Sequence, residues 1–240
     1  MARCFIGTSG WSYDSWVGQL YPEDLERRRW LEHYAQRFSS VEINATFYRT
    51  PPETMFRAWA GRTPDGFTFA VKASRYITHI RRLDVEQASV DKVMQRARLL
   101  GERLGPVLYQ LPPRWRCDPA RLERCARLLP SNVVNAFEFR DASWFDERVY
   151  EVLRRHGLVF CIYHMPEQES PLVVTGPAVY LRFHGTSGLY YGTYGPALKP
   201  WGQRIRGWLK EGLDVYAYFN NTGAGEAVDD ALYLKELVGT

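Results

Sequence analysis

The amino-acid sequence predicts a single α/β domain with a TIM-like (β/α)8 barrel fold. Short β-rich runs alternate with helix-like segments along 240 residues, and about eight such units make up a barrel of this kind. No glycine-rich dinucleotide fingerprint follows the first run, because GTSGW lacks the required spacing, and this disfavours a doubly wound open sheet. No linker, internal repeat or low-complexity tract interrupts the pattern. We therefore expect residues 1–240 to form one TIM-like barrel domain.

The predicted strands are short runs rich in Val, Ile, Phe and Tyr, which is typical of buried β-structure. Their hydrophobic positions are interrupted by polar residues mainly toward the carboxyl end of each run. In chain order the runs are 4–9, 40–48, 67–74, 106–112, 135–141, 159–165, 178–185 and 214–221.

Helix-like segments separate most of these runs. Asp118 and Pro119 form a good start signal for one helix, and Gly157 forms a good stop signal for another. The stretch MPEQESPLVVTGP at 165–177 contains several prolines, so we expect an irregular barrel with no regular helix between its sixth and seventh strands. The predicted helical segments are 23–38, 52–62, 85–105, 119–129, 146–157, 202–212 and 224–237.

Composition and charge restrict the class of protein. Hydrophobic residues make up 45% of the chain and charged residues 24%, as in an ordinary soluble globular protein. No apolar run approaches the roughly 20 residues of a membrane helix, and MARCFIGTSG lacks the apolar core of a signal peptide. These features predict a cytoplasmic protein without a membrane partner. The net charge of +4 is mild and suits an anionic small ligand or weak nucleic-acid contact.

Polar side chains recur at the carboxyl ends of the predicted strands. In NAFEFRDASW, alternation places Glu138 and Arg140 on one face and the two phenylalanines on the other. Inward residues near strand carboxyl ends face the active-site mouth of a barrel. Applied to every run, this alternation predicts that the mouth contains Thr8, Glu42, Asn44, Lys72, Ser74, Gln110, Glu138, Arg140, His164, Arg182, His184, Tyr218 and Asn220.

The charges in this set predict an anionic ligand. Two carboxylates face three fixed cations, and arginine suits bidentate recognition of phosphate or carboxylate. Such residues could instead form a buried structural network, although desolvation makes networks of this kind poor stabilisers. The predicted ligand-binding residues are Lys72, Arg140, Arg182, Asn44, Gln110, Asn220 and Tyr218.

The main hypothesis is an enzyme that acts on a phosphorylated or carboxylated small molecule. Glu138 and Glu42 are the candidates for general base and general acid, and His184 is a second proton-transfer candidate. The glycine- and tyrosine-rich stretch GTSGLYYGTYG at 185–195 is either a lid over the substrate or a flexible surface loop. The sequence does not identify the substrate, the reaction, a cofactor or the oligomeric state.

Two alternatives remain open at this point. Glu138, His164 and His184 follow successive strands and form an acceptable ligand set for zinc or manganese, which suggests a metal-dependent isomerase or hydrolase. Arginine residues beside this set argue against a bound dication. A nucleic-acid-binding or processing protein is the other alternative, because SRYITHIRR (74–82) and PPRWRCDPAR (112–121) interleave aromatic and basic residues.

Seven successive motifs resemble those of the YecE-like family, domain of unknown function 72. The resemblance covers nearly the whole chain and implies a TIM-barrel-like fold, but it supplies no function. The chain departs from the usual pattern of the family at His164, where Asp is common, and at Glu226, where His is common. We therefore carry over no metal or proton chemistry from relatives at these positions. The motifs are GTSGWSYDSWVGQLYP, VEINATFYRTP, FAVKASRYITH, GPVLYQLPP, FEFRDASWF, VYLRFHG and VYAYFNN.

Overall fold

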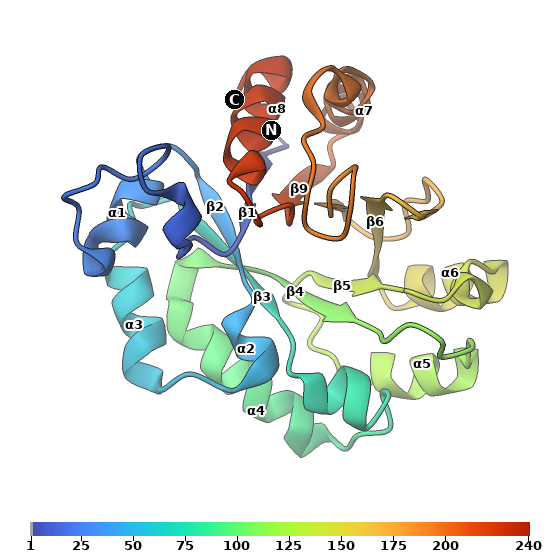
Figure 1. The fold of residues 1–240 in the computed structure, drawn as a ribbon. Helices are drawn as coiled ribbons and strands as arrows, with labels where there is room; N and C mark the ends of the chain where they lie inside the picture. The colour runs from blue at the N-terminus through green and yellow to red at the C-terminus, as the bar shows by residue number, and fades with distance from the viewer. Residues whose placement is uncertain (1) are drawn as a thin grey trace.

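A computed structural model of the chain describes residues 2–240 and shows a closed barrel of parallel strands (Figure 1). Neighbouring strands pair in the order β1-β2-β3-β4-β5-β6-β8-β9, and the pairing of β1 with β9 closes the ring. The (β/α)8-type fold predicted from the sequence is confirmed. The barrel strands are β1 (Cys4–Ser9), β2 (Ser40–Ile43), β3 (Thr68–Lys72), β4 (Leu104–Gln110), β5 (Asn135–Glu138), β6 (Val159–Met165), β8 (Ala178–Phe183) and β9 (Asp214–Phe219).

Helices surround the barrel, as the ring of coiled ribbons in Figure 1 shows. Asp118 caps α5 by accepting a hydrogen bond from the backbone N–H of Arg121, and Pro119 occupies the first turn, as the sequence predicted. The α-helices are α1 (Trp30–Tyr34), α2 (Ala45–Tyr48), α3 (Glu53–Gly61), α4 (Gln87–Ala97), α5 (Pro119–Ala126), α6 (Glu147–Arg155), α7 (Lys199–Lys210) and α8 (Glu226–Val238). None of the helices in the described part of the chain is long and apolar enough to cross a membrane.

The barrel is irregular between β6 and β8, where no helix forms. The connection instead contains β7 (Gln168–Glu169), which pairs antiparallel with the end of β6. This confirms the expected absence of a regular helix in the proline-containing stretch 165–177. In Figure 1 the gap lies between α6 and α7, and only loop covers the barrel there.

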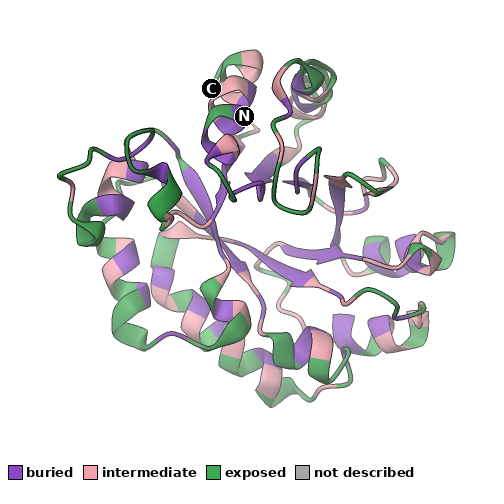
Figure 2. Cartoon of the chain, viewed as in Figure 1, coloured by how far each residue is buried: buried purple, intermediate pink, exposed green. Residues whose placement is uncertain are grey.

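Two apolar cores hold the barrel together. The larger core fills the space between the strands and the surrounding helices, and the smaller one fills the barrel interior. Figure 2 shows the strands buried along nearly their whole length. Gly7 allows the close approach of β1 to β2, because a Cβ atom there would lie 2.0 Å from the Ser40 carbonyl oxygen. The inner core consists of Phe5, Ala70, Leu108, Ala136, Val159, Cys161, Ala178, Tyr180, Tyr216 and Tyr218.

Two predicted elements are shorter in the structure than expected. The segment 23–38 is helical only from Arg27, first as a 3-10 turn and then as α1, because 23–29 offers only Leu25 as an apolar side chain to bury. The predicted strand 40–48 ends at Ile43, and its remainder turns into α2. There the Thr46 hydroxyl donates to the Lys72 carbonyl oxygen at 2.6 Å, which ties this turn to β3.

Candidate functional site

A buried arginine joins the two predicted carboxylates at the mouth of the barrel. Arg182 on β8 donates to Glu42 on β2 and to Glu138 on β5, each at 2.7 Å. All three side chains are essentially inaccessible to solvent. Ser9 and Tyr180 also donate to Glu42, each at 2.7 Å, so both of its oxygens have partners. The structure therefore brings Glu42, Glu138 and Arg182 together as one charged network.

The second arginine of the site connects this network to a histidine. Arg140 pairs with Glu138 and donates through Nη2 to Nε2 of His184 at 2.9 Å. A guanidinium only donates hydrogen bonds, so Nε2 of His184 accepts from Arg140. The side-chain amide of Asn220 lies 3.0 Å from Nδ1 and orients the ring.

The positive charges of Arg140 and Arg182 determine the protonation states of Glu138 and His184. Burial alone would raise the pKa of Glu138, but Arg140 and Arg182 hold the pKa of this carboxyl well below its usual range. Burial, together with the same two cations, lowers the pKa of His184 to about 3. At neutral pH the site therefore contains an ionised Glu138 and a neutral His184.

Lys72 is the cation of the site that has no carboxylate partner. It ends β3, half-buried, and its Nζ lies 4.4 Å from the centre of the Phe47 ring, a cation–π distance. Among residues 2–240 its amine forms no ion pair within 4.0 Å and no hydrogen bond. Two carboxylates against three cations leave one positive charge in surplus, and the pairing pattern assigns that charge to Lys72.

Further polar groups at the mouth also lack partners within the described chain. The Asn44 side-chain oxygen after β2 and the Tyr163 hydroxyl on β6 are buried without a hydrogen bond. The Tyr163 ring lies under the Arg140 guanidinium at 5.0 Å and is 6.1 Å from the His184 ring. Gln110 ends β4 half-buried, beside Glu138 in the strand register. Unpaired buried polar groups are costly, so these atoms are open to a further hydrogen-bond partner.

Three predicted mouth residues lie elsewhere. Thr8 points outward to the Tyr34 hydroxyl at 2.9 Å, and its neighbour Ser9 takes the inward position. Tyr218 points inward but lies deeper, where its hydroxyl meets Ser40 at 2.7 Å. Ser74 accepts a hydrogen bond from the Tyr76 backbone, at the start of the turn after β3.

His164 faces the outside of the barrel, which corrects the predicted strand register by one residue. Because Cys161 points into the inner core, alternation along β6 turns Tyr163 inward and His164 outward. The His164 ring contacts Tyr194 at 2.8 Å and Glu169 at 3.1 Å.

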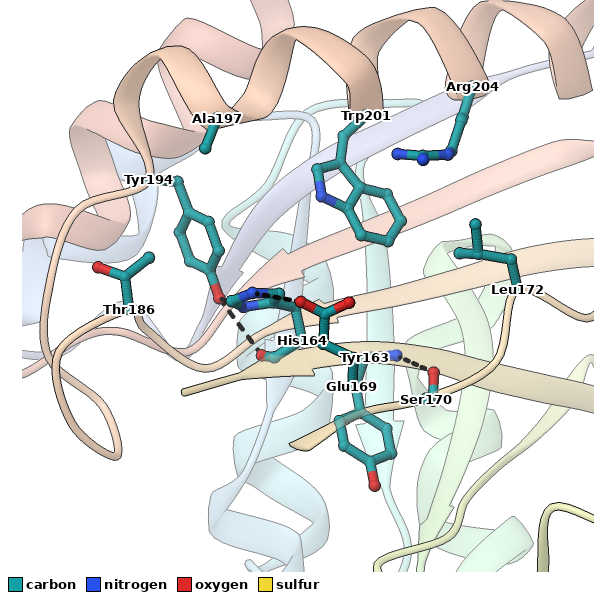
Figure 3. Close-up of a pocket in the computed structure, with 10 residues that line it drawn as sticks. All are labelled: Tyr163, His164, Glu169, Ser170, Leu172, Thr186, Tyr194, Ala197, Trp201 and Arg204. Carbon is teal, nitrogen blue, oxygen red and sulfur yellow. Dashed lines mark hydrogen bonds and ion pairs between the residues drawn. The ribbon is translucent and has the colours of Figure 1, made fainter. Parts of the chain in front are cut away.

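These groups line a cavity of about 270 Å³ that also contacts Trp201 and Arg204 on α7. Figure 3 shows His164 and Glu169 at this cavity, while the Tyr163 ring points away from it. The cavity lies on the side of the barrel where the helix between β6 and β8 is absent.

The metal set suggested by the sequence is not assembled. His164 lies on the opposite face of β6 from Glu138 and His184, so the three predicted ligands do not converge. In the described part of the chain, no group of three His, Cys, Asp or Glu side chains could hold a metal ion.

The loop after β8 is held against the barrel by one buried carboxylate. Asp230 on α8 accepts from the backbone N–H groups of Tyr194 and Gly195 and from the side chains of Thr193 and Asn221. The loop therefore has a fixed base, while its tip at 189–191 is exposed and Tyr190 has a positive φ of 74°.

Basic residues follow the three strands that carry Asn44, Lys72 and Gln110. Among residues 2–240 none of them forms an ion pair with a carboxylate. Tyr48 and Tyr76 are exposed beside them, whereas Trp115 is buried and does not offer its ring to a ligand. We call this set the basic rim; it consists of Arg49, Arg75, Arg81, Arg82, Arg114 and Arg116.

A family model described as a protein of unknown function, DUF72, matches residues 5–240. The chain belongs to the DUF72 family. The UPF0759 protein YunF of Bacillus subtilis (strain 168) is 27% identical to this DUF72 chain over an aligned length of 270 residues. The match covers 98% of the chain and 94% of YunF.

Two solved structures of DUF72 proteins match the whole fold. The structure from Thermotoga maritima MSB8 is 29% identical with a TM-score of 0.89, and the match covers 99% of this chain and 100% of that one. The structure from Enterococcus faecalis V583 is 20% identical with a TM-score of 0.84, and the match covers 100% of this chain and 96% of that one. The second likeness shows the fold alone. Both agree with the barrel fold expected from the sequence.

Sequence reasoning missed Ser9, Tyr163 and Tyr180 at this DUF72 site. Ser9 and Tyr180 donate to Glu42, and Tyr163 packs against Arg140. Strand alternation anchored on Cys161 instead of His164 would have found Tyr163, because cysteine is a common core residue.

Proposed function

We propose that this DUF72 protein binds a small phosphorylated or carboxylated molecule at the barrel mouth and acts on it by acid–base chemistry. The observation that carries the proposal is the surplus charge of Lys72 beside a network whose other charges are paired. Arg140 is the second contact for the anion, because its side chain remains 10% exposed while Arg182 beneath it is fully buried. Glu42 and Arg182 then serve to hold Glu138 and Arg140 in place.

Anion binding would also prepare His184 for proton transfer. In the unliganded site Arg140 donates to Nε2 and its charge disfavours protonation of the ring. An anion that accepts hydrogen bonds from Arg140 frees Nε2 and offsets this positive charge. The pKa of His184 would then rise toward the neutral range, where a general base works best.

Thermal unfolding in the presence of phosphate, sugar phosphates and small carboxylates tests the proposal. A ligand present at 100 times its Kd stabilises a protein by about 2.7 kcal/mol, which for a chain of this size shifts Tm by roughly 5–10 °C. We expect such a shift with at least one anion, and its loss in Lys72→Gln and Arg140→Gln.

Arg127→Gln is the matched control. Arg127 caps the carboxyl end of α5, and its exposed side chain pairs with Glu123. This variant removes the same charge at the opposite end of the barrel, because helices of this fold run antiparallel to the strands. A shift that persists in Lys72→Gln and Arg140→Gln would contradict the proposed site.

The basic rim supports a second candidate function, binding of single-stranded nucleic acid. Its unpaired arginines and the exposed Tyr48 and Tyr76 match the cation and stacking groups that such ligands use. Affinity for a fluorescent oligonucleotide should then fall steeply with salt and weaken further in the double variant Arg75→Gln/Arg82→Gln. Binding that is insensitive to both changes would remove this candidate.

A further inference from the structure

Lys72 differs from the other lysines of the chain in its surroundings. The sequence contains five lysines: Lys92, Lys199 and Lys210 are exposed on helices, and the partly buried Lys235 donates to the Arg37 carbonyl oxygen. Lys72 is partly buried at the end of β3, with an aromatic ring on one side and no acceptor for its amine protons among residues 2–240. The cation–π contact with Phe47 stabilises the ammonium, but it offsets the cost of burial less than a carboxylate partner would.

Electrostatics at the mouth favour the neutral amine further. Burial and the nearby Arg182 lower the pKa of Lys72 to about 8, while Glu42 and Glu138 raise it and Arg140 lowers it. The two carboxylates are already paired with arginines, so they compensate the ammonium only in part. Near pH 8 a substantial fraction of Lys72 is therefore unprotonated, and desolvated amines beside other cations are effective nucleophiles.

We propose that Lys72 forms an iminium with the carbonyl group of a small molecule that carries a carboxylate or phosphate. The proposal deepens the proposed function, because it depends on the anion being held at Arg140. It narrows the substrate class from any small anion to 2-oxo acids and phosphorylated aldehydes or ketones.

Formation of the iminium requires only the Lys72 amine, the carbonyl compound and protons. The lone pair of Nζ attacks the carbonyl carbon, the C=O π electrons move to oxygen, and that oxygen takes up a proton while nitrogen loses one. The resulting carbinolamine then releases its hydroxyl group as water after a second protonation, and a C=N⁺ bond remains. These protons can come from water, and the Tyr163 hydroxyl, which has no hydrogen-bond partner in the described chain, is a further protonated group at the mouth.

Borohydride reduction of the full-length protein tests this proposal. Reduction converts an iminium into a stable secondary amine, and peptide mass mapping then shows which lysine carries the adduct. The probes are pyruvate and dihydroxyacetone phosphate, with acetone as a carbonyl compound that lacks the anion. We expect adducts at Lys72 with one of the anionic probes at pH 8, formed more than about tenfold faster than at Lys92, Lys199 or Lys210.

Two variants separate covalent chemistry from binding. Lys72→Arg keeps the positive charge and removes the nucleophile, so we expect the anion-induced rise in Tm to persist while the adduct disappears. Lys199→Arg is the matched control and should leave the adduct unchanged. Labelling of Lys72 no faster than that of the exposed lysines with both anionic probes would overturn the proposal. If anions still raise Tm in that case, the proposal of anion binding at the mouth is retained and only iminium formation is rejected. If anions do not raise Tm, both anion binding and iminium formation are rejected.

Discussion

Among single residues, Arg182 carries most of the electrostatic organisation of the barrel. Its guanidinium is buried and bridges two carboxylates on the non-adjacent strands β2 and β5. Removing one partner of a buried ion pair leaves an uncompensated charge, which costs far more than the pair contributes as a whole. Arg182 is therefore paired and buried, whereas the side chains of Lys72 and Arg140 remain partly exposed.

Arg182→Gln should lower the free energy of unfolding by about 3–5 kcal/mol, because Glu42 and Glu138 then lose their shared cation. Urea denaturation at pH 7 measures this change. Arg154→Gln is the control, since Arg154 pairs with Glu147 in an exposed position and should cost less than about 1 kcal/mol. Similar losses in the two variants would contradict the buried role of Arg182.

His184 should make the protein less stable as the pH falls. Its folded pKa of about 3 lies below its ordinary value of 6.5, so between these values the unfolded state binds a proton that the folded state does not. Stability should therefore drop by about 1.4 kcal/mol per pH unit from this residue alone as the pH falls below 6.5. His184→Gln should show a shallower dependence in urea denaturation from pH 7 to pH 4.5; equal slopes would count against a neutral buried His184.

Among the structural elements, the loop 185–195 is held at the mouth by contacts from several parts of the chain. Tyr194 anchors its base, since the hydroxyl contacts Gly185 on one side and His164 on the other. Asp230 fixes the same segment from α8. The exposed side chains of Leu189, Tyr190 and Tyr191 lie between these anchors. The tip is also tied to the barrel, because the Tyr190 backbone donates to the His184 carbonyl oxygen and accepts from the Gly223 N–H.

Asp230→Asn should loosen this loop, because an amide replaces a carboxylate that accepts from two backbone N–H groups. We expect chymotrypsin to cleave at 189–191 several-fold faster than in the wild type, since local opening exposes the chain to protease. Asp229→Asn is the matched control, because Asp229 is the exposed neighbour of Asp230 on the same helix. Equal cleavage rates in the two variants would show that Asp230 does not hold the loop.

At the scale of the whole molecule, ring closure makes every strand depend on two neighbours. β1 pairs with both β2 and β9, so the first and last barrel strands lie side by side (Figure 1). The outer core is continuous around the ring, from Ile6 to Leu234. Continuous packing of this kind is what a single domain would show, and the expectation of one domain stays a prediction.

The chain should therefore unfold in one cooperative transition. Far-UV circular dichroism reports the helices, and tryptophan fluorescence reports residues spread from Trp11 to Trp208. We expect coincident urea midpoints from the two signals, which is the test of two-state behaviour. Two separated midpoints would show that parts of the barrel unfold independently and would contradict the single-domain prediction.

Sequence patterns predicted much of this architecture because they record local physics. Strand runs, helix caps at Asp118 and the prolines of 165–177 each depend on a few neighbouring residues. Errors arose where distant contacts override local preference. Thr46, Phe47 and Tyr48 favour a strand, yet the hydrogen bond from Thr46 to the Lys72 carbonyl stabilises a helical turn instead.

The sequence by itself determined the barrel, the family and the gathering of charged side chains at one end of the strands. Only the tertiary structure decided which of those charges are paired. Arg182 meets both carboxylates, and Lys72 is left beside Phe47, because distances across a closed ring depend on strand order and stagger. Strand alternation predicts which side chains face the barrel interior only when one inward residue of the strand is known. On β6 an error of one residue placed His164 at the mouth instead of Tyr163. That register is set by packing of the whole barrel, which no local pattern contains.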